Sequence, residues 1–560
     1  MSSEGNGQSA GDRGGRGSTV LGALYRIQTL LVAAWADRRL RIAICAAIFL
    51  VGLLLRVTLV MVWQTYKESS RRFEPVNIAR SLYRTGTYAD PFPEPTGPTA
   101  HSPPFHPFLL SLLYHLLGDN HSAEVLKRCL SSAVSSLAFA LLLLLARPFG
   151  VLVMAGVLAG LTGAFSPMSF DIETSGNFET PWVALGLMLL ACITLRHHQA
   201  GCERASTALW HGLAWGLALY ISPAFLPVLL SFLLLGVVWR PSARALVLRH
   251  ALLTVAVAAL VTVPWTVRNH ARLGAWIPFR SNFPLEFFIS NNDEARAGFE
   301  ENFGSGPFKR LHPSQNPAET QRMRQLGEAA YNQALIGQAM NWVRAHPQRF
   351  LALTAQRVLA FWFPVSRTPA KTVVFWCLPP LALLGLWRLA RSAPLAAWHL
   401  ASLLIFYPLP YYVIQISHRY RYPLDWVLLL LTAHAILSSR PGRFLLERAA
   451  AGQARSAGAH AACTRAPGGM LVTQDRSSLP EWRARTTRRP GWLEEFRKRR
   501  AGLARASPGR GLRWARCLFG ARRQHAIIRT ASERSASDSA TGGGSYGPDK
   551  LRRRCLTWNG

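Results

Sequence analysis

Apolar runs recur through most of the chain and end before residue 440. The first run, Ile42 to Trp63, is long enough to cross a hydrocarbon core of about 30 Å. It also lacks the cleavage site of a signal peptide. The pattern predicts further spans at Leu130–Ala146, Val151–Phe165, Pro181–Leu195, Ala208–Ile221, Ala224–Trp239, Ala251–Trp265, Val373–Leu389, Leu395–Tyr412 and Leu424–Leu437. We therefore predict an all-α integral membrane protein with about 10 transmembrane helices, or 11–13 if marginal segments also cross.

One segment, His346 to Pro364, differs because Gln and Arg recur about one helical turn apart between its apolar residues. This pattern is typical of an amphipathic helix that lies in the membrane interface. With this segment in the interface, the Arg-rich connections fall on one side, which the positive-inside rule makes cytoplasmic. The opposite side receives a first long loop, 64–128, and a second long loop, 266–366, where we expect the function to reside.

The first long loop begins with a helical pattern, FEPVNIARSLYRTGTY, which places Glu74 near the start and Gly86 near the end. The prolines of the following GPTAHSPPFHP favour extended backbone. The apolar segment Phe108 to Gly118 is too short to span a membrane, so we expect a juxtamembrane helix. Together these elements would hold Glu74 at the boundary between water and lipid.

Composition supports the membrane class and divides the chain into three parts. The sequence is 50% hydrophobic and 16% charged, with a net charge of +34. About half of that excess lies in residues 439–560, an Arg-, Ala-, Gly- and Ser-rich tail without apolar periodicity that we expect to be disordered and cytoplasmic. Residues 1–40 form a cytoplasmic segment and 41–438 the membrane domain. RNA or anionic lipid could bind the tail, but a GC-rich or frame-shifted extension without a role explains it as well, so nucleic acid is not a favoured partner.

Common metal and cofactor motifs are absent from the sequence. The eight cysteines are scattered and form no CxxC pair, which predicts neither a disulfide framework nor a metal site. The chain also has no GxGxxG, Walker loop or HExxH motif, so it has no recognisable binding site for a soluble nucleotide cofactor.

Several polar stretches resemble one family of membrane enzymes. The first long loop, with FEPVNIARSLYRTGTY and GPTAHSPPFHPFLLSLLYHLLG, is similar to the first outer loop of GT-C membrane glycosyltransferases. The resemblance is to the bacterial branch related to protein O-mannosyltransferases and aminoarabinose transferases. It continues in FDIETSGNFETPWVALGLMLL, VPWTVRNHARLGAWIPFRSNFPLEFFISNN, LGEAAYNQALIGQAMNWVRAHPQRF and YPLPYYVIQISHRYRYPLDW, and covers roughly residues 40 to 438.

This resemblance implies a GT-C fold and an inverting transfer of sugar from a polyprenyl-phosphate donor. The acceptor would be a protein, a lipid or a glycan on the extracytoplasmic side of a bacterial inner membrane. Such a reaction needs a base for the acceptor hydroxyl, cations for the departing phosphate and a groove for the prenyl tail. No cofactor is required, although some relatives use a divalent metal ion.

The predicted base is Glu74, because the family carries an acidic residue in this loop. Many relatives have Asp or an Asp-Glu pair where this chain has a single Glu, and a helix cap or ion pair would also explain Glu74. Asp171 and Glu173, in the next connection on the outer side, are the next candidate acids and could meet Glu74 over the substrate, or serve as turn residues. Glu179 lies at the mouth of a span, where a carboxylate is costly and suggests a role, although helix capping is an alternative.

The remaining candidates are cationic and polar residues on the same predicted side. Arginine binds phosphate bidentately, whereas snorkelling to lipid headgroups is the alternative for each one. The phosphate candidates are Arg268, Arg280, His418, Arg419 and Arg421, and the acceptor or sugar candidates are His101, His106, Asn269, Asn282 and Asn291. The histidines could equally be ordinary loop residues and the asparagines turn caps.

Two other classes remain open. A transporter or flippase for a lipid-linked or polar substrate would explain the spans and the arginines, but the chain has no evident internal repeat. A scaffold that has lost catalysis would explain the single acid in the first long loop.

Overall fold

The computed structural model describes residues 37–67, 73–166, 170, 178–201, 205–304, 306–366 and 368–439. Within these ranges the protein is helical and has no strand, apart from the isolated bridges Ala89–Pro98 and Gly298–Ile416. The all-α prediction is therefore confirmed. Residues 1–36 and most of the predicted tail lie outside the described residues, so the assignments made for them stay predictions.

The predicted spans all coincide with helices. The helices long and apolar enough to cross a membrane are α2 (Arg38–Trp63), α5 (His121–Ala146), α8 (Glu179–Ala200), α11 (Arg244–Leu273) with its preceding turn, and α18 (Pro369–Ser392). The other predicted spans coincide with the shorter helices α6 (Val153–Ala164), α9 (Ala205–Leu219), α10 (Phe225–Trp239), α19 (Pro394–Phe406) and α20 (Tyr422–Leu437). The protein is a membrane protein, and the number of crossings stays a prediction.

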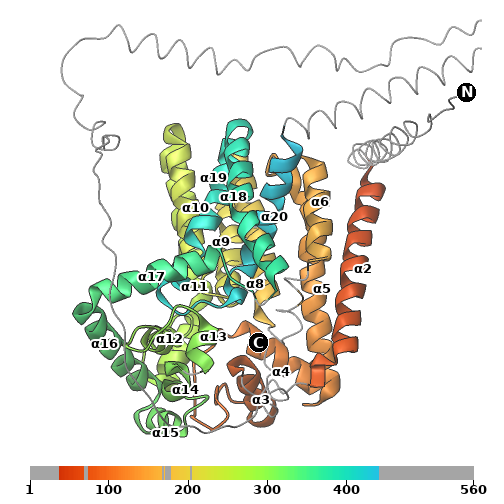
Figure 1. The fold of residues 1–560 in the computed structure, drawn as a ribbon. Coiled ribbons are helices and arrows are strands. Elements are labelled where there is room, and N and C mark those ends of the chain that lie inside the picture. The colour runs from red at the N-terminus through yellow and green to blue at the C-terminus, as the bar shows by residue number, and fades with distance from the viewer. Residues whose placement is uncertain are drawn as a thin grey trace, which may run out of the picture. The chain divides into compact units, whose positions relative to one another are not determined.

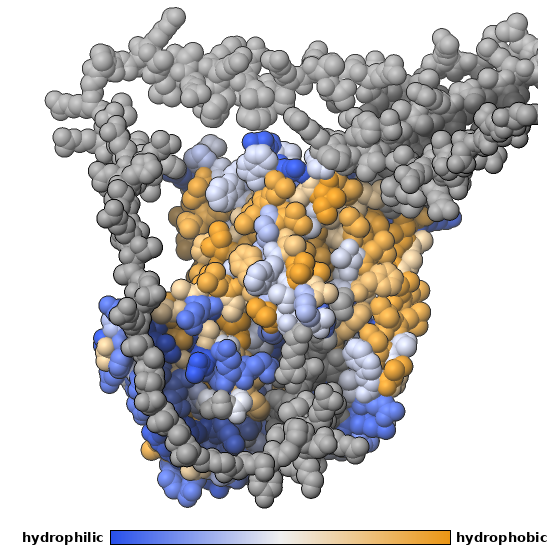
Figure 2. Space-filling model, viewed as in Figure 1, coloured by the Kyte–Doolittle hydropathy of each residue, from blue (hydrophilic) through white to orange (hydrophobic). Residues whose placement is uncertain are grey.

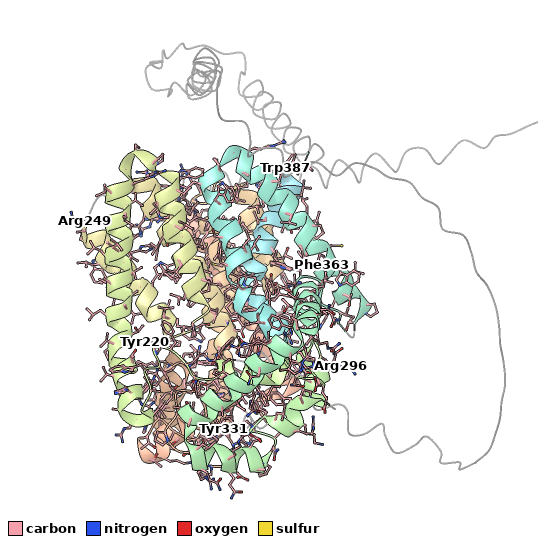
Figure 3. The ribbon with its side chains drawn as sticks, turned by 90° about the vertical axis from the view of Figure 1, so that its left-hand side faces the viewer. Tyr220, Arg249, Arg296, Tyr331, Phe363 and Trp387 are labelled. Atoms are coloured by element: carbon pink, nitrogen blue, oxygen red, sulfur yellow. The ribbon has the colours of Figure 1, made fainter. Side chains whose placement is uncertain are left out.

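The helices of the bundle run side by side, and the long loops gather at one end of it, which we call the loop end (Figure 1). Apolar side chains cover the middle of the bundle, and hydrophilic side chains cover the loop end (Figure 2). Trp387 lies towards the opposite end of the bundle, whereas Tyr331 lies at the loop end (Figure 3). This distribution agrees with a bundle whose apolar middle lies in lipid.

Both long loops fold into short helices. The first contributes α3 (Glu74–Thr85) and α4 (Phe105–Leu117); the second contributes α12 (Phe283–Ser290), α13 (Phe299–Gly304), α14 (Pro307–Leu311), α15 (Pro317–Leu326), α16 (Glu328–Ala345) and α17 (Pro347–Trp362). The α3 helix ends at Thr85 and is capped by Gly86, whose φ of 69° suits glycine. The amphipathic α17 lies crosswise to the bundle (Figure 1), as an interfacial helix would.

Several boundaries differ from the predictions, and the sequence explains two of them. The α19 helix ends at Phe406 rather than Tyr412, because Pro408 interrupts it and a 3₁₀ turn, Leu409–Val413, follows. The α5 helix begins at His121, well before the predicted Leu130, and Asn120 caps its first amide groups. Hydropathy misses these first turns because they carry charged side chains that are nevertheless buried.

Glycines set the closest helix contacts in the bundle. A Cβ atom at Gly156 or Gly160 of α6 would lie 2.6 Å from Leu142 O or 2.8 Å from Phe139 O of α5. At Gly385 of α18 a Cβ atom would collide with the carbonyl oxygen of Leu431 in α20. Small residues allow such backbone approach between membrane helices.

We expect Gly385→Ala to destabilise the protein by about 1–3 kcal/mol, since α18 must move away from α20. The measurement is thermal unfolding in detergent. The control is Gly337→Ala, on α16, where a Cβ atom meets nothing within 4 Å and alanine favours the helix. Equal melting temperatures for the two variants would contradict the close packing of α18 on α20.

Candidate active site

Five charged residues from separate segments converge at the loop end of the bundle. Glu74 is the first residue of α3, Glu179 the first of α8, and Glu286 lies in α12. Arg280 precedes α12, and Arg419 lies in the short turn before α20. The charges of Glu286, Arg419 and Arg280 act on Glu74, and those of Glu179 and Glu74 act on Arg419. We call these five residues the charged cluster.

Glu74 is placed in the cluster by the start of α3. Phe73 is extended and Pro75 occupies the first helical turn, so the helix begins at the glutamate itself. A quarter of the side chain remains accessible. Burial of the carboxyl raises its pKa to about 7, its own backbone N–H opposes the rise, and Glu286 adds to it while Arg419 and Arg280 oppose it. Glu74 can therefore gain or lose a proton near neutral pH.

The two arginines carry fixed positive charge beside these carboxylates. Burial lowers the pKa of Arg419, but the charges of Tyr420, Glu179 and Glu74 outweigh it, so the net shift is upward. Its guanidinium lies 5.2 Å from the centre of the Tyr420 ring. Arg280 makes no ion pair within the described ranges, and its Nε atom is buried without a hydrogen-bond partner there. An anion bound at the cluster would supply that partner.

Glu286 completes the cluster from the second long loop. Its Oε2 atom accepts a hydrogen bond from Nε2 of Gln415 at 3.1 Å. Burial raises the pKa of Glu286, whereas Arg419, the hydrogen bond from Gln415 and Arg280 lower it. The sequence analysis did not select Glu286, although a lone carboxylate within the apolar FPLEFFIS is a signal of the kind that drew attention to Glu179.

His101 and His106, the two histidines predicted to bind the acceptor or sugar, are buried rather than exposed. His106 lies between the rings of Phe105 and Phe178, and burial lowers its pKa to about 4. His101 packs against Phe92, and burial, together with the charge of Arg280, lowers its pKa well below the usual value. Both rings are therefore neutral at neutral pH and do not act as cations.

Several predicted binding residues are used for packing. Arg268 donates to the carbonyl oxygens of Tyr88 and Thr99. Asn269 donates to Ile277 O at 2.8 Å and accepts from Arg268. Asn291 donates to Phe287 O and Val413 O. These contacts join the second long loop to the rest of the protein. They leave few hydrogen-bonding groups of these three side chains for a sugar or phosphate.

The remaining predicted residues are not members of the charged cluster. Arg421 is buried and pairs with Asp425 at 3.3 Å. The His418 ring stacks on Phe375, with 6.2 Å between ring centres. Asn282 precedes α12 without a side-chain capping bond. Asp171 and Glu173 lie outside the described residues, so their assignment stays a prediction.

One buried carboxylate holds the two long loops together. Glu328, at the start of α16, accepts hydrogen bonds from Thr99 Oγ1, from Ala100 N at 2.8 Å and from Ser281 Oγ at 2.6 Å. Ser281 N also donates to Ala100 O at 2.9 Å. This contact fixes His101 and Arg280, each one residue from it, and sequence analysis did not find it because its partners are far apart in the chain.

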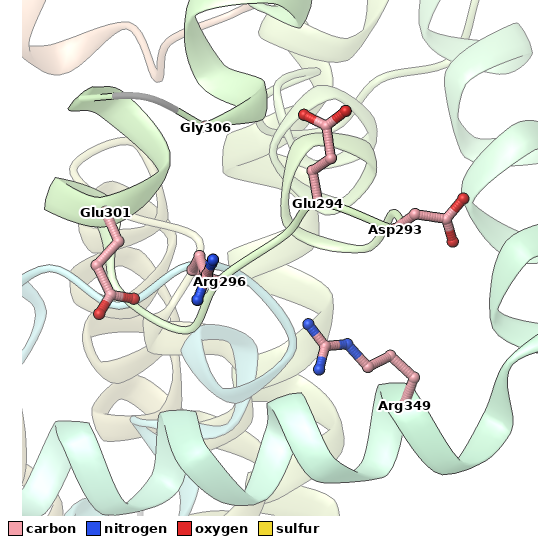
Figure 4. A pocket seen from close by; sticks show the side chains of 6 residues that line it. All are labelled: Asp293, Glu294, Arg296, Glu301, Gly306 and Arg349. Carbon is pink, nitrogen blue, oxygen red and sulfur yellow. The ribbon is translucent and has the colours of Figure 1, made fainter. Parts of the chain in front are cut away.

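A second polar feature lies further along the second long loop. A pocket of about 420 Å³ opens between the segment 293–306 and α17, which supplies Arg349 (Figure 4). Its other lining residues are Asp293, Glu294, Arg296, Glu301 and Gly306. Within the described part of the chain, no group of three or more His, Cys, Asp or Glu residues is arranged to hold a metal ion.

Part of the chain matches a known family. Residues 101–267 match the family model described as dolichyl-phosphate-mannose-protein mannosyltransferase. The match confirms, over this region, the resemblance to GT-C membrane glycosyltransferases that the sequence predicts. The region includes Glu179 but not Glu74, Arg280, Glu286 or Arg419. No protein with a curated description matches the chain.

Solved structures of an oligosaccharyltransferase from Archaeoglobus fulgidus are similar to the chain. The form tethered to an acceptor peptide with the NVT sequon has 17% identity and a TM-score of 0.45, over 74% of this chain and 53% of that one. The form with an inhibitory peptide and a dolichol-phosphate has 16% identity and a TM-score of 0.41, over 70% and 50%. The chain spans about half the length of these structures.

We expect Glu328→Leu to destabilise the protein by about 2–3 kcal/mol, because buried donors lose their acceptor. Thermal unfolding in detergent measures the change. Glu294→Gln is the control, since it alters an exposed pair with Arg310 and should leave the melting temperature nearly unchanged. A Glu328→Leu protein as stable as the control would show that the loops do not depend on this carboxylate.

Proposed function

We propose that the protein is a membrane glycosyltransferase that moves a sugar from a polyprenyl-phosphate donor to an acceptor at the loop end, with inversion. The observation that carries the proposal is the charged cluster, in which a carboxyl group with a pKa of about 7 lies beside two arginines. The family match over residues 101–267 supports the same reaction class.

Glu74 is the general base in this proposal. Its ionised carboxylate takes the proton of the acceptor hydroxyl while that oxygen bonds to the anomeric carbon of the sugar. The bond between this carbon and the donor's phosphate oxygen breaks, and the phosphate leaves with the electron pair. A single displacement of this kind inverts the anomeric centre, and a pKa near 7 suits a base that works at neutral pH.

Arg280 and Arg419 bind the donor's phosphate in this proposal. The leaving phosphate gains negative charge, and guanidinium groups already in place stabilise that charge without reorganisation. Arg280 supports this role because it has no ion-pair partner in the described residues, and a bound anion would supply a partner for its buried Nε atom.

A lipid-linked donor fits the position of the cluster. Glu179 is the first residue of α8, one of the helices long enough to span the membrane, so the cluster lies where the apolar bundle meets the polar loops. The prenyl chain would remain among apolar side chains while the phosphate reaches the arginines. Acceptor hydroxyls of a protein, a lipid or a glycan would meet the same base, on the side that we propose is extracytoplasmic.

We expect Glu74→Gln to abolish sugar transfer, with a rate at least about 100-fold lower, because the amide cannot accept the proton. The measurement is transfer of radiolabelled sugar from a panel of polyprenyl-phosphate sugars in membranes that contain the protein. Glu94→Gln, in the same loop and exposed, is the matched control and should transfer normally.

Transfer by Glu74→Gln at the normal rate would remove Glu74 from the chemistry. If the folded wild-type protein transfers sugar from no donor, the glycosyltransferase proposal fails and a transporter or a scaffold takes its place.

We expect Arg280→Ala to reduce transfer by about 100-fold, because the departing phosphate loses a charged donor. Arg280→Lys should recover part of the rate, since it restores the charge but not the bidentate geometry. Arg272→Ala changes an exposed arginine at the end of α11 and should have little effect. Initial rates across donor concentrations measure these changes, and equal rates for the two alanine variants would contradict the role of Arg280.

A further inference from the structure

His312, in the second long loop, contacts Glu74, the proposed general base in the first long loop. It directly follows α14 and is fully buried. Its ring stacks on Phe308, with 4.3 Å between ring centres, and meets the edge of Phe92 at 5.5 Å. These contacts fix the plane of the imidazole, and its Nε2 atom lies 3.8 Å from Oε1 of Glu74.

The hydrogen bonds at Nδ1 determine the tautomer of His312. The backbone N–H of Ser314 lies 3.0 Å from Nδ1 of His312, and a backbone N–H can only donate a hydrogen bond. Nδ1 therefore accepts and carries no proton. The Ser314 hydroxyl lies 2.7 Å from the same atom and can donate to it as well. In the neutral ring the proton is then on Nε2, the atom that faces Glu74.

The Nε2–H group has no other partner. It is buried and makes no hydrogen bond within the described residues. Burial lowers the pKa of His312 to about 3, so the contact with Glu74 is between a neutral donor and a carboxylate rather than an ion pair. A small rotation of the partly accessible Glu74 side chain closes the 3.8 Å gap, and catalytic hydrogen bonds are often long before substrate binds.

We propose that His312 is a positioning residue for Glu74: its Nε2–H holds Oε1 of the carboxylate and leaves Oε2 for the acceptor hydroxyl. The proposal rests on the proposed function, because it assumes that Glu74 is the base. His312 touches neither donor nor acceptor in it and acts only through the glutamate.

The position of His312 predicts a specific effect on pH dependence. An N–H donor favours the ionised carboxylate, so its loss raises the pKa of Glu74. Other charged groups that face Glu74 are Glu286 from α12, Arg419 from the turn before α20 and Arg280 from the preceding loop. None of them changes in a His312 variant. The His312 ring itself faces the neutral ring of His101.

The test is the pH dependence of sugar transfer by the full-length protein in membranes. Wild-type transfer should fall as the pH drops through about 7, because Glu74 becomes protonated. His312→Phe keeps the stacked ring but removes the N–H hydrogen-bond donor. We expect the midpoint of the pH profile to rise by about one pH unit, so that at pH values below the midpoint the rate is about tenfold lower than in the wild type. The donor KM should stay unchanged.

Two variants serve as controls. His312→Gln places an amide N–H near the Nε2 position and should restore the wild-type midpoint. Ser314→Ala removes the hydroxyl but keeps the backbone N–H that sets the tautomer, so its midpoint should also be that of the wild type. A structural role for His312 would change the amount of folded protein and would not move the midpoint.

The possible failures can be told apart. No transfer by the wild type defeats the proposed function, and normal transfer by Glu74→Gln defeats the base assignment; neither result involves His312. A wild-type midpoint in folded His312→Phe overturns the positioning role alone. If His312→Phe does not fold, His312→Asn replaces it, because its amide reaches the Nδ1 position but not Nε2; it should show the raised midpoint, and a wild-type midpoint there overturns the proposal.

Discussion

The buried carboxylate of Glu328 joins the two long loops, and the candidate active site exists only where those loops meet. Glu74 comes from the first loop, whereas Arg280, Glu286 and His312 come from the second. A flexible connection between the loops could not hold charged groups in fixed positions, and catalysis depends on such fixed positions. A carboxylate with three donors is a costly way to join loops, since burial disfavours its charge. Its hydrogen bonds offset that cost and define one arrangement.

The charged cluster holds three carboxyl groups and two arginines. The charge of Glu286 helps to raise the pKa of Glu74, whereas Arg419 and Arg280 oppose the rise. A donor phosphate that binds Arg280 and Arg419 would compete for their positive charge. The arginines would then lower the pKa of Glu74 less. Its pKa would rise, and the carboxylate would become a stronger base when the sugar donor is present. Donor binding and base strength are therefore linked in the proposed mechanism.

The sequence predicts the local features of this arrangement and misses the long-range ones. Hydropathy locates every helix of the bundle but misses the first turns of α5, where charged residues are buried within the helix. Glu74 is found because a resemblance points to its loop. His312 and Glu328 are not found, because their roles depend on residues far away in the chain. Arg268 and Asn269 fit a binding pattern in the sequence, yet their donors are used by carbonyl groups that only the folded chain brings near.

The crosswise helix α17 links two parts of the cluster, the segments that carry Glu286 and Arg419. Arg357 on α17 is buried and donates to Ser290 O and to Asn291 Oδ1, at the end of the helix that carries Glu286. At the C-terminal end of α17, the indole of Trp362 donates to Tyr412 OH at 2.8 Å, in the segment that leads to Arg419.

The segment before Arg419 is also bound to the second long loop directly. Gln415 N donates to Ser290 Oγ at 2.8 Å, and Ile416 pairs with the backbone of Ala297 and Phe299. An amphipathic helix in the interface is sensitive to the position of the lipid surface. Because α17 holds both segments, a helix seated correctly in the membrane would also set Glu286 and Arg419 at the correct separation. In this arrangement, a shift of α17 relative to the lipid surface would move both segments together.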